Sequence, residues 1–335
     1  MVAASIVVLA AAITTVLVWR HQRQPPRVPL GLRTVATIPL PGDTSRFDYA
    51  SLDPQQGLLF IAHLGASQVI EVDIHNNRVV RTIDNLPGVH GVIVVPELHK
   101  VYATATNANQ MVILDEDTGT PLARGATGEY PDGLAYDPKH ATIWTTNESG
   151  GSETILDAKT ANVRATITLG GEAGNVYYDA TTGNMLVDVQ TRNELAVIDT
   201  TTDTITRRVA LPDCDHDHGL TIDTADRLAL VACDANATLL TLDLTTWQIL
   251  DQHPVGQDPD VLAYDSDAHR LYVAAESGWL TTVDVHNRQT IISGSSHLAD
   301  GAHVVAVDPT THRSYYPIPS GSDGRPALLV LEPTR

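Results

Sequence analysis

One arrangement of polar and apolar positions returns seven times along the chain. A polar or small residue precedes four mostly apolar residues, then Asp in six of the seven copies, then a turn and an alternating strand. The copies begin at Asp48, His90, Asp132, Gly174, His218, Asp260 and His303. Their spacings of 42, 42, 42, 44, 42 and 43 residues predict a repeat architecture.

Each copy contains three further strand patterns after the first. In the sixth copy these are residues 270–275, 279–285 and 289–292, with a turn at His286-Asn287 before the last one. The runs are short, rich in β-branched residues and alternate with period two. Four such strands in every forty-odd residues predict one blade of a β-propeller.

The two ends of the chain predict how the propeller closes. The seventh copy supplies three strands and the chain then ends, so its blade lacks a fourth strand. Residues 32–39 precede the first copy and resemble the fourth strands of the other copies. We therefore predict an all-β fold, a seven-bladed β-propeller of four-stranded blades spanning residues 32–335, whose N-terminal strand completes the last blade.

Several segments resemble the YVTN-type, or YncE-like, seven-bladed propellers. They are the Tyr-Pro-Asp-Gly-Leu-Ala-Tyr-Asp-Pro run at 130–138, the Arg-Leu-Tyr-Val-Ala run at 270–274 and residues 195–205. The resemblance covers about nine-tenths of the chain and implies the propeller fold and an exported protein, but it says little about function. Some members of this family are reported to bind nucleic acid.

The N-terminus differs from the repeats. Residues 1–18 contain only Ser5, Thr14 and Thr15 as non-apolar residues, and Trp19 and Arg20 follow. Eighteen residues lie at the lower limit for spanning a bilayer, and the flanks of a cleaved signal peptide are not evident. We interpret residues 1–19 as an anchor or signal segment and 20–31 as a linker, which predicts an extracytoplasmic, membrane-anchored protein.

The charge narrows the choice of partners, and the two cysteines leave a disulfide open. The formal net charge is −19, and beyond residue 27 it is 18 − 40 = −22. Such an acidic body repels phosphate backbones, so we expect a cation, small ligand or protein partner rather than nucleic acid, and a monomeric body. The two cysteines, Cys214 and Cys233, could form a disulfide in an exported protein or remain free buried thiols.

The first position of each repeat is the strongest candidate for chemistry. The first strand of a blade lines the central channel, so these positions form a ring at one mouth. Imidazole and carboxylate groups on one axis favour a divalent transition metal over calcium. The alternative is that they are turn formers at a wet channel mouth. The predicted metal ligands are Asp48, His90, Asp132, His218, Asp260 and His303.

Two further groups of polar residues accompany this ring. The ends of the second strands reach the same face and, with the neighbour of Gly174, predict the wall of a ligand pocket. That predicted wall is His63, Asn107, Asn147, Glu148, Asn175, Gln190, Asp234 and Glu276. The Asp that ends most first strands belongs to the opposite face and is predicted to cap a tight turn. These caps are Asp53, Asp137, Asp179, Asp223, Asp265 and Asp308.

Two functions remain open from the sequence. The first is a ligand- or protein-binding module with a metal or small-ligand site at the channel mouth. The second is a metal-dependent enzyme, lactonase-like or redox, that uses the same ring. The chain contains no phosphate-binding loop, nucleophile elbow or zinc-protease motif, so no catalytic residue can be assigned.

Overall fold

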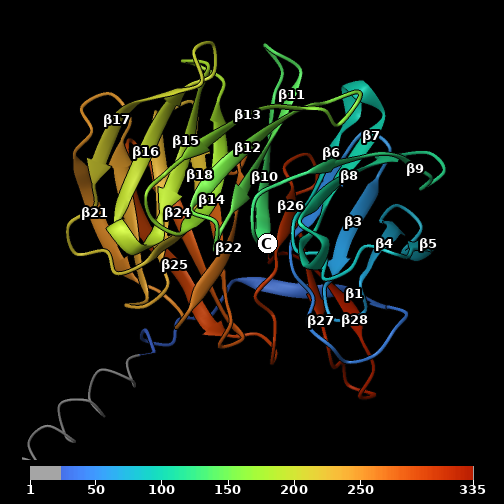
Figure 1. The fold of residues 1–335 in the computed structure, drawn as a ribbon. Coiled ribbons are helices and arrows are strands. Elements are labelled where there is room, and N and C mark those ends of the chain that lie inside the picture. The colour runs from blue at the N-terminus through green and yellow to red at the C-terminus, as the bar shows by residue number, and fades with distance from the viewer. Residues whose placement is uncertain (1–23, 335) are drawn as a thin grey trace, which may run out of the picture.

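The computed structural model describes residues 24–334, which form seven four-stranded antiparallel sheets. The innermost strands of successive sheets contact one another around a closed ring, from β2 to β26 and back to β2. Figure 1 shows the sheets following one another around this ring in chain order. The predicted seven-bladed β-propeller is confirmed.

The blades follow the predicted repeats. Blades 1 to 3 comprise β2 (Ala50–Asp53), β3 (Leu58–His63), β4 (Gln68–Asp73), β5 (Arg78–Ile83); β6 (Val92–Val95), β7 (Lys100–Ala105), β8 (Gln110–Asp115), β9 (Pro121–Ala126); β10 (Pro131–Asp137), β11 (Thr142–Asn147), β12 (Ser152–Asp157) and β13 (Val163–Thr168). Blades 4 and 5 comprise β14 (Ala173–Asp179), β15 (Asn184–Val189), β16 (Glu194–Asp199), β17 (Thr204–Ala210); β18 (Asp217–Asp223), β19 (Leu228–Cys233), β20 (Thr238–Asp243) and β21 (Ile249–Pro254).

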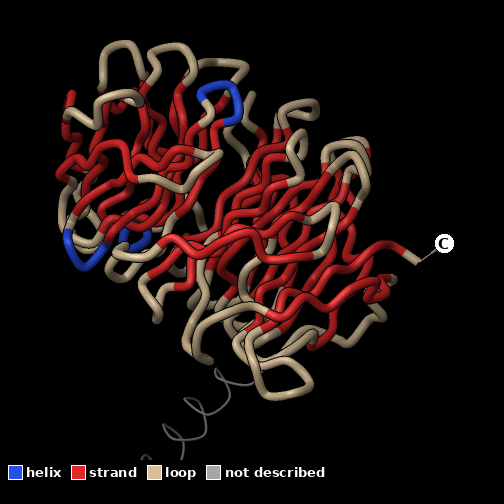
Figure 2. Tube along the Cα trace, turned by 90° about the vertical axis from the view of Figure 1, so that its right-hand side faces the viewer, coloured by secondary structure: helices blue, strands red, loops and turns tan. Residues whose placement is uncertain are grey.

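Blades 6 and 7 complete the ring. They comprise β22 (Pro259–Asp265), β23 (Arg270–Ala275), β24 (Trp279–His286), β25 (Gln289–His297); β26 (Ala306–Asp308), β27 (Arg313–Ile318), β28 (Ala327–Pro333) and β1 (Leu32–Pro39). Three short 3-10 helices lie within the described residues, at η1 (Pro96–Leu98), η2 (Thr106–Ala108) and η3 (Gln190–Arg192). Figure 2 shows how little helix accompanies the strands.

The ring closes as predicted. β1 pairs antiparallel with β28, with Thr34 opposite Leu331 and Ile38 opposite Leu328. The N-terminal strand is therefore the fourth strand of the last blade, so both ends of the propeller are held in one sheet. This pairing covers an edge of β28 that would otherwise expose unpaired backbone groups.

The hydrophobic core lies between neighbouring blades. One buried cluster joins Leu195 and Val197 of β16 to Leu220 and Ile222 of β18. Strand side chains alternate between the two faces of a sheet. A strand in the middle of a blade, with neighbouring blades covering both faces, is therefore apolar on both sides. This explains why β23 reads as a continuous run with five fully buried positions after Arg270.

The repeated Asp residues cap turns on the face predicted for them. Asp53 Oδ1 accepts a hydrogen bond from the backbone N–H of Gln55 at 2.8 Å, and Asp308 Oδ1 accepts one from Thr310 at 2.9 Å. The equivalent bonds at Asp137, Asp179, Asp223 and Asp265 are also present. A carboxylate that accepts local N–H groups stabilises a tight turn.

The segment predicted as a linker contacts the propeller. Val28 pairs with Ser295 through two backbone hydrogen bonds of 2.7 and 2.8 Å, so part of residues 24–31 lies against β25. The predicted anchor at residues 1–19 lies outside the described residues. Across residues 24–334, no helix is both long enough and apolar enough to cross a membrane.

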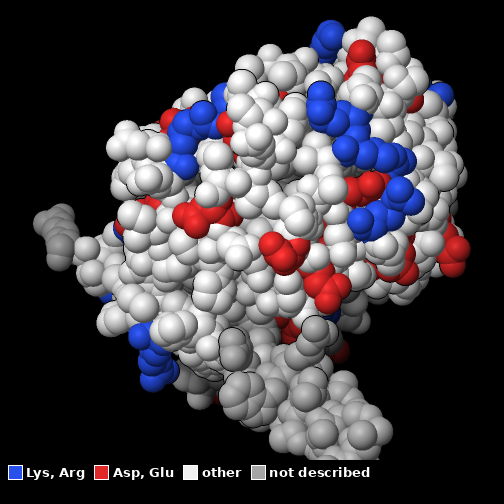
Figure 3. Space-filling model, turned by 90° about the vertical axis from the view of Figure 1, so that its left-hand side faces the viewer, with Lys and Arg blue, Asp and Glu red and all other residues white. Residues whose placement is uncertain are grey.

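The outer surface carries both signs of charge. Figure 3 shows Lys and Arg side chains gathered on one face with acidic side chains among them. Ion pairs are present around β13, β16 and β17: Arg192 and Arg208 both pair with Glu194, and Arg164 pairs with Asp203. The charges of these three arginines are therefore matched by carboxylates, whereas Arg207 of β17 lies over the Trp247 ring at 5.3 Å.

Candidate functional site

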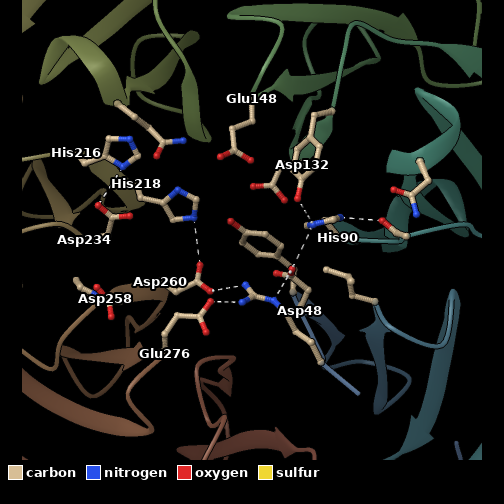
Figure 4. Close-up of a pocket in the computed structure, with 18 residues that line it drawn as sticks. Asp48, His90, Asp132, Glu148, His216, His218, Asp234, Asp258, Asp260 and Glu276 are labelled. Carbon is tan, nitrogen blue, oxygen red and sulfur yellow. Dashed lines mark hydrogen bonds and ion pairs between the residues drawn. The ribbon is translucent and has the colours of Figure 1, made fainter. Parts of the chain in front are cut away.

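A cavity of about 450 Å³ occupies the channel mouth where the sequence predicts the ring. Five of the six predicted metal ligands line it, namely Asp48, His90, Asp132, His218 and Asp260. Figure 4 shows these five side chains converging from different blades. His303 is 3% exposed and lies beside the cavity, with its Nε2 3.9 Å from Asp260 Oδ2.

Backbone bulges lie at several ring positions. In blade 3 the pairing of β10 with β11 shifts register between Pro131 and Leu134, so Asp132 lies in the shift. The same shift surrounds Asp260 in β22 and His218 in β18. A bulge redirects a side chain from the regular alternation of a strand. We infer that the bulges help direct these side chains toward the channel.

The glycines that follow ring residues serve close packing between blades. A Cβ atom at Gly91 would lie 2.1 Å from the backbone oxygen of Asp132, and one at Gly219 would lie 2.5 Å from that of Asp260. Neither glycine has a positive φ. The sequence left open that the ring positions are turn formers, but the glycines after His90 and His218 are required because the backbone of the next ring residue approaches closely.

The sequence prediction missed the residues two positions before the ring. Arg46, Tyr130, His216 and Asp258 line the cavity, each two residues before a ring residue. Tyr130, His216 and Asp258 have φ values of 59°, 67° and 52°, a left-handed conformation that is uncommon outside glycine. The constant offset of two residues before each ring position is the signal in the repeat that could have identified these four residues.

The three ring histidines have different hydrogen-bonding roles. His90 Nδ1 faces the backbone oxygen of Gly88 at 2.8 Å, and the Tyr130 hydroxyl lies 3.0 Å from His90 Nε2. A carbonyl oxygen only accepts, so a neutral His90 ring carries its hydrogen on Nδ1 and has its lone pair on Nε2. His90 Nε2 is therefore an acceptor that takes the Tyr130 hydroxyl hydrogen, and Asp48 Oδ2 lies 4.0 Å from it. A metal ion at His90 would displace this one hydroxyl bond.

His218 acts instead as a donor. Its Nε2 lies 3.2 Å from Asp260 Oδ1. Burial by itself lowers the pKa of His218, but the hydrogen bond and charge of Asp260 outweigh it and raise the pKa to about 10. Burial raises the pKa of Asp260, yet His218, His303 and Arg46 together hold it below its usual range. His218 and Asp260 are thus a charged pair near neutral pH.

His303 is held by the backbone. Its Nδ1 lies 3.1 Å from the oxygen of Gly301 and its Nε2 lies 3.0 Å from the oxygen of Phe47. Both ring nitrogens therefore have a carbonyl partner. A metal ion at His303 would have to displace one of these bonds.

Two ring carboxylates lack the donors that buried acids require. Asp48 and Asp132 are 2% and 4% exposed, and Asp48 Oδ2 and Asp132 Oδ1 accept no hydrogen bond. Burial, and then the negative charge of Asp260, raises the pKa of Asp48. Burial, and then Asp48, raises the pKa of Asp132 well above its usual range. Each of these two residues therefore has a buried oxygen without a hydrogen-bond donor, which is costly for a carboxylate.

Arg46 supplies positive charge on the other side of the ring. Its Nε lies 3.5 Å from Asp48 Oδ2, its Nη2 lies 3.4 Å from Asp260 Oδ2, and its Nη1 forms an ion pair with Glu276. Burial lowers the pKa of Arg46, but these three carboxylates raise it above its usual value. Seven acidic residues line the cavity, and Arg46 is the only Lys or Arg among the described residues that do so.

The predicted pocket wall divides into two groups. Asn107, Glu148, Gln190, Asp234 and Glu276 line the cavity. The other three, His63, Asn147 and Asn175, are buried residues that do not line it.

Two residues of this second group have evident structural contacts. The Asn147 amide bonds the backbone of Gly128 and Ser152. The His63 ring stacks on Phe47 at 4.2 Å and bonds Ser45 and Gln68. Successive side chains of a strand point to opposite faces of the sheet. The position of a residue at the end of a strand therefore does not show whether its side chain points into the cavity.

A disulfide fixes the rim beside blade 5. Cys214 and Cys233, left as bonded or free by the sequence, are joined with their Cα atoms 5.4 Å apart. The loop between Cys214 and β18 holds His216, whose Nδ1 lies 3.0 Å from Asp234 Oδ1. The disulfide thus ties one side of the cavity rim to the end of β19.

The fold and the cavity together define the class of this protein: a seven-bladed β-propeller with an acidic, histidine-bearing mouth to its channel. The propeller fold is typical of binding modules. The family comparison then gives the particular group. The YNCE-like beta-propeller family matches residues 43–298, and the chain belongs to this family.

Solved structures share the fold at low sequence identity. The crystal structure of the RRP9 WD40 repeats has a TM-score of 0.75 at 8% identity, covering 90% of this chain and 99% of that one. Kuenenia stuttgartiensis hydrazine synthase has a TM-score of 0.72 at 13% identity, covering 88% and 95%. No curated protein sequence matches the chain. These similarities establish the fold alone.

Proposed function

We propose that this protein is an exported YncE-like binding module that holds a divalent transition-metal ion through Asp48, His90 and Asp132. One observation carries the proposal: Asp48 and Asp132 each have a buried carboxylate oxygen without a hydrogen-bond donor, and both residues lie next to His90. One ligand atom from each of the three residues lies within 4.8 Å of the others. A cation here would replace the missing donors and offset the cost of two buried acids.

The donor set supports a transition metal over calcium. One imidazole nitrogen with carboxylate oxygens suits zinc, manganese, iron or cobalt, whereas calcium prefers six to eight oxygen ligands. The His90 ring is held in place from its other nitrogen, because Nδ1 lies 2.8 Å from the backbone oxygen of Gly88 and 3.0 Å from Thr106 Oγ1. Such bonds orient a ligand imidazole and set its tautomer.

The proposal of export rests on the cysteines. Cys214 and Cys233 form a disulfide, and such bonds persist in oxidising compartments outside the cytoplasm. The apolar residues 1–19 would act as the anchor or signal segment. Fractionation of cells that produce the full chain, with thiol labelling of the recovered protein, tests this part. Recovery in the cytoplasm with two free thiols would contradict it.

Calorimetric titration with Co²⁺ tests the metal site. The protein should be untagged and treated with a chelator beforehand, and we expect one equivalent to bind with visible absorption bands. His90→Ala should abolish binding because it removes the acceptor nitrogen. His286→Ala, at the exposed end of β24, is the matched control and should bind as the wild type does. The absence of binding, or equal binding by His90→Ala, would refute the site.

The enzyme alternative is favoured by one observation. The three proposed ligands adjoin a cavity of about 450 Å³, and catalytic metal sites combine three protein ligands with an open position. The seven acids of the wall would favour a neutral or cationic substrate over an anionic one. Turnover of neutral esters or lactones by the metal-loaded protein, lost in His90→Ala, would favour this alternative; its absence would favour the binding module.

A further inference from the structure

The ring contains a second set of candidate ligands beside the proposed metal site. Ligand atoms of Asp48, Asp260 and His303 also lie within 4.8 Å of one another. Asp48 belongs to both sets, so the two sets share one carboxylate. By side-chain type alone the second set matches the first, with two carboxylates and one imidazole.

Positive charge already occupies the second set. Arg46 Nη2 lies 3.4 Å from Asp260 Oδ2, and Arg46 also pairs with Glu276 at the rim. The other oxygen of Asp260 faces His218 Nε2 at 3.2 Å. In Figure 4, Asp260 and Glu276 lie together on one side of the cavity, opposite Asp132 and Glu148. The carboxylates of this half therefore have partners, unlike Asp132 Oδ1.

The two halves interact through one atom. Asp48 Oδ2 lies 3.5 Å from Arg46 Nε and 4.0 Å from His90 Nε2. A guanidinium so close to a shared ligand repels a metal ion at either set, in a buried region where charges are weakly screened.

We propose that Arg46 is a resident counter-cation that closes the Asp48–Asp260–His303 set to metal and leaves the Asp48–His90–Asp132 set open. This inference rests on the proposed function for the open set. Arg46 thereby determines that the ring takes one ion instead of two, and it weakens the affinity for that ion through Asp48. It acts as a specificity-determining residue, although it is not itself a ligand.

Replacing Arg46 with Met tests the inference, since Met retains length and removes the charge. We expect Arg46→Met to bind two equivalents of Co²⁺ where the wild type binds one, with the first bound about tenfold or more tightly. Arg33→Met is the control, because Arg33 pairs with Glu332 on the outer β1–β28 edge and leaves the cavity unchanged. It should bind one equivalent with wild-type affinity.

Double variants assign each ion. The second equivalent should disappear in Arg46→Met/His303→Ala, and the first in Arg46→Met/His90→Ala. If Arg46→Met does not fold, Arg46→Ala with and without methylguanidinium, at a concentration that leaves the fold intact, replaces it. The added cation should suppress the second equivalent by occupying the space of the missing side chain.

The outcomes separate the inference from the proposed function. No binding by the wild type but one His303-dependent equivalent in the variant would overturn the proposed function and support the role of Arg46. Equal stoichiometry in wild type and Arg46→Met, whether none, one or two, would overturn the inference. Two equivalents in the wild type would likewise overturn it, because the guanidinium would then not close the second set.

Discussion

Removing the covalent link between Cys214 and Cys233 should destabilise the propeller by a predictable amount. The two cysteines are 19 residues apart, and a crosslink stabilises chiefly by restricting the unfolded chain. For a loop of about 20 residues the chain-entropy relation gives about 3 kcal/mol at 25 °C. We expect reduction to lower the free energy of unfolding by that amount, so the reduced protein should unfold at a lower urea concentration.

The measurement can separate the crosslink from packing. Cys214 is 6% exposed and Cys233 is fully buried, so replacing both by Ala also leaves small cavities. Reduction in urea, followed by refolding with reductant present, keeps both sulfur atoms in place and removes only the bond. The reduced wild type should therefore lose about 3 kcal/mol, and the Cys214→Ala/Cys233→Ala variant somewhat more.

Two results would refute this reasoning. A free energy of unfolding unchanged by reduction would show that the link does not restrict the unfolded chain. A loss of similar size in the double Ala variant on adding reductant would show that the effect does not come from this disulfide. Cobalt titration of the reduced protein adds a functional readout, because the link holds the rim at His216 but none of the three proposed ligands. We expect the stoichiometry to remain one.

Two further changes test other parts of the structure. Burial, and then Asp53, raises the pKa of Glu116 from 4.5 to about 8. Between these two pH values the folded state binds a proton that the unfolded state has lost. The free energy of unfolding therefore falls as the pH rises, by at most about 1.4 kcal/mol per pH unit. Urea unfolding from pH 5 to 8 should show a shallower fall for Glu116→Gln than for the wild type or the exposed control Glu97→Gln; equal slopes would contradict the shift. Gly91→Ala should cost about 1–3 kcal/mol and disturb cobalt binding, because the new Cβ overlaps the backbone of Asp132. Gly321→Ala, whose nearest atom would lie at 3.2 Å, is its control in thermal unfolding, and equal midpoints would argue against the close contact.

The repeat predicted the fold in detail because every blade obeys the same local rules. Strand β23 has the bounds expected from alternation, and β1 completes the last blade as its pattern indicated. The inner strands were less predictable at their starts. β2 begins at Ala50 and β26 at Ala306, two and three residues after their ring positions. A strand begins where pairing begins, and pairing at the channel mouth depends on the neighbouring strand.

The repeat pattern is sufficient to predict the seven blades, their closure and the ring of Asp and His at one mouth, because periodicity places equivalent positions at equivalent points of a closed ring. The differences between those side chains become visible only in the folded protein. His90 retains an acceptor nitrogen, whereas His303 is bonded to carbonyl groups at both nitrogens. Arg46 reaches Asp260, 214 residues away in the chain. These roles arise from contacts between different blades, and a repeat pattern carries no information about which partner each side chain meets across the channel.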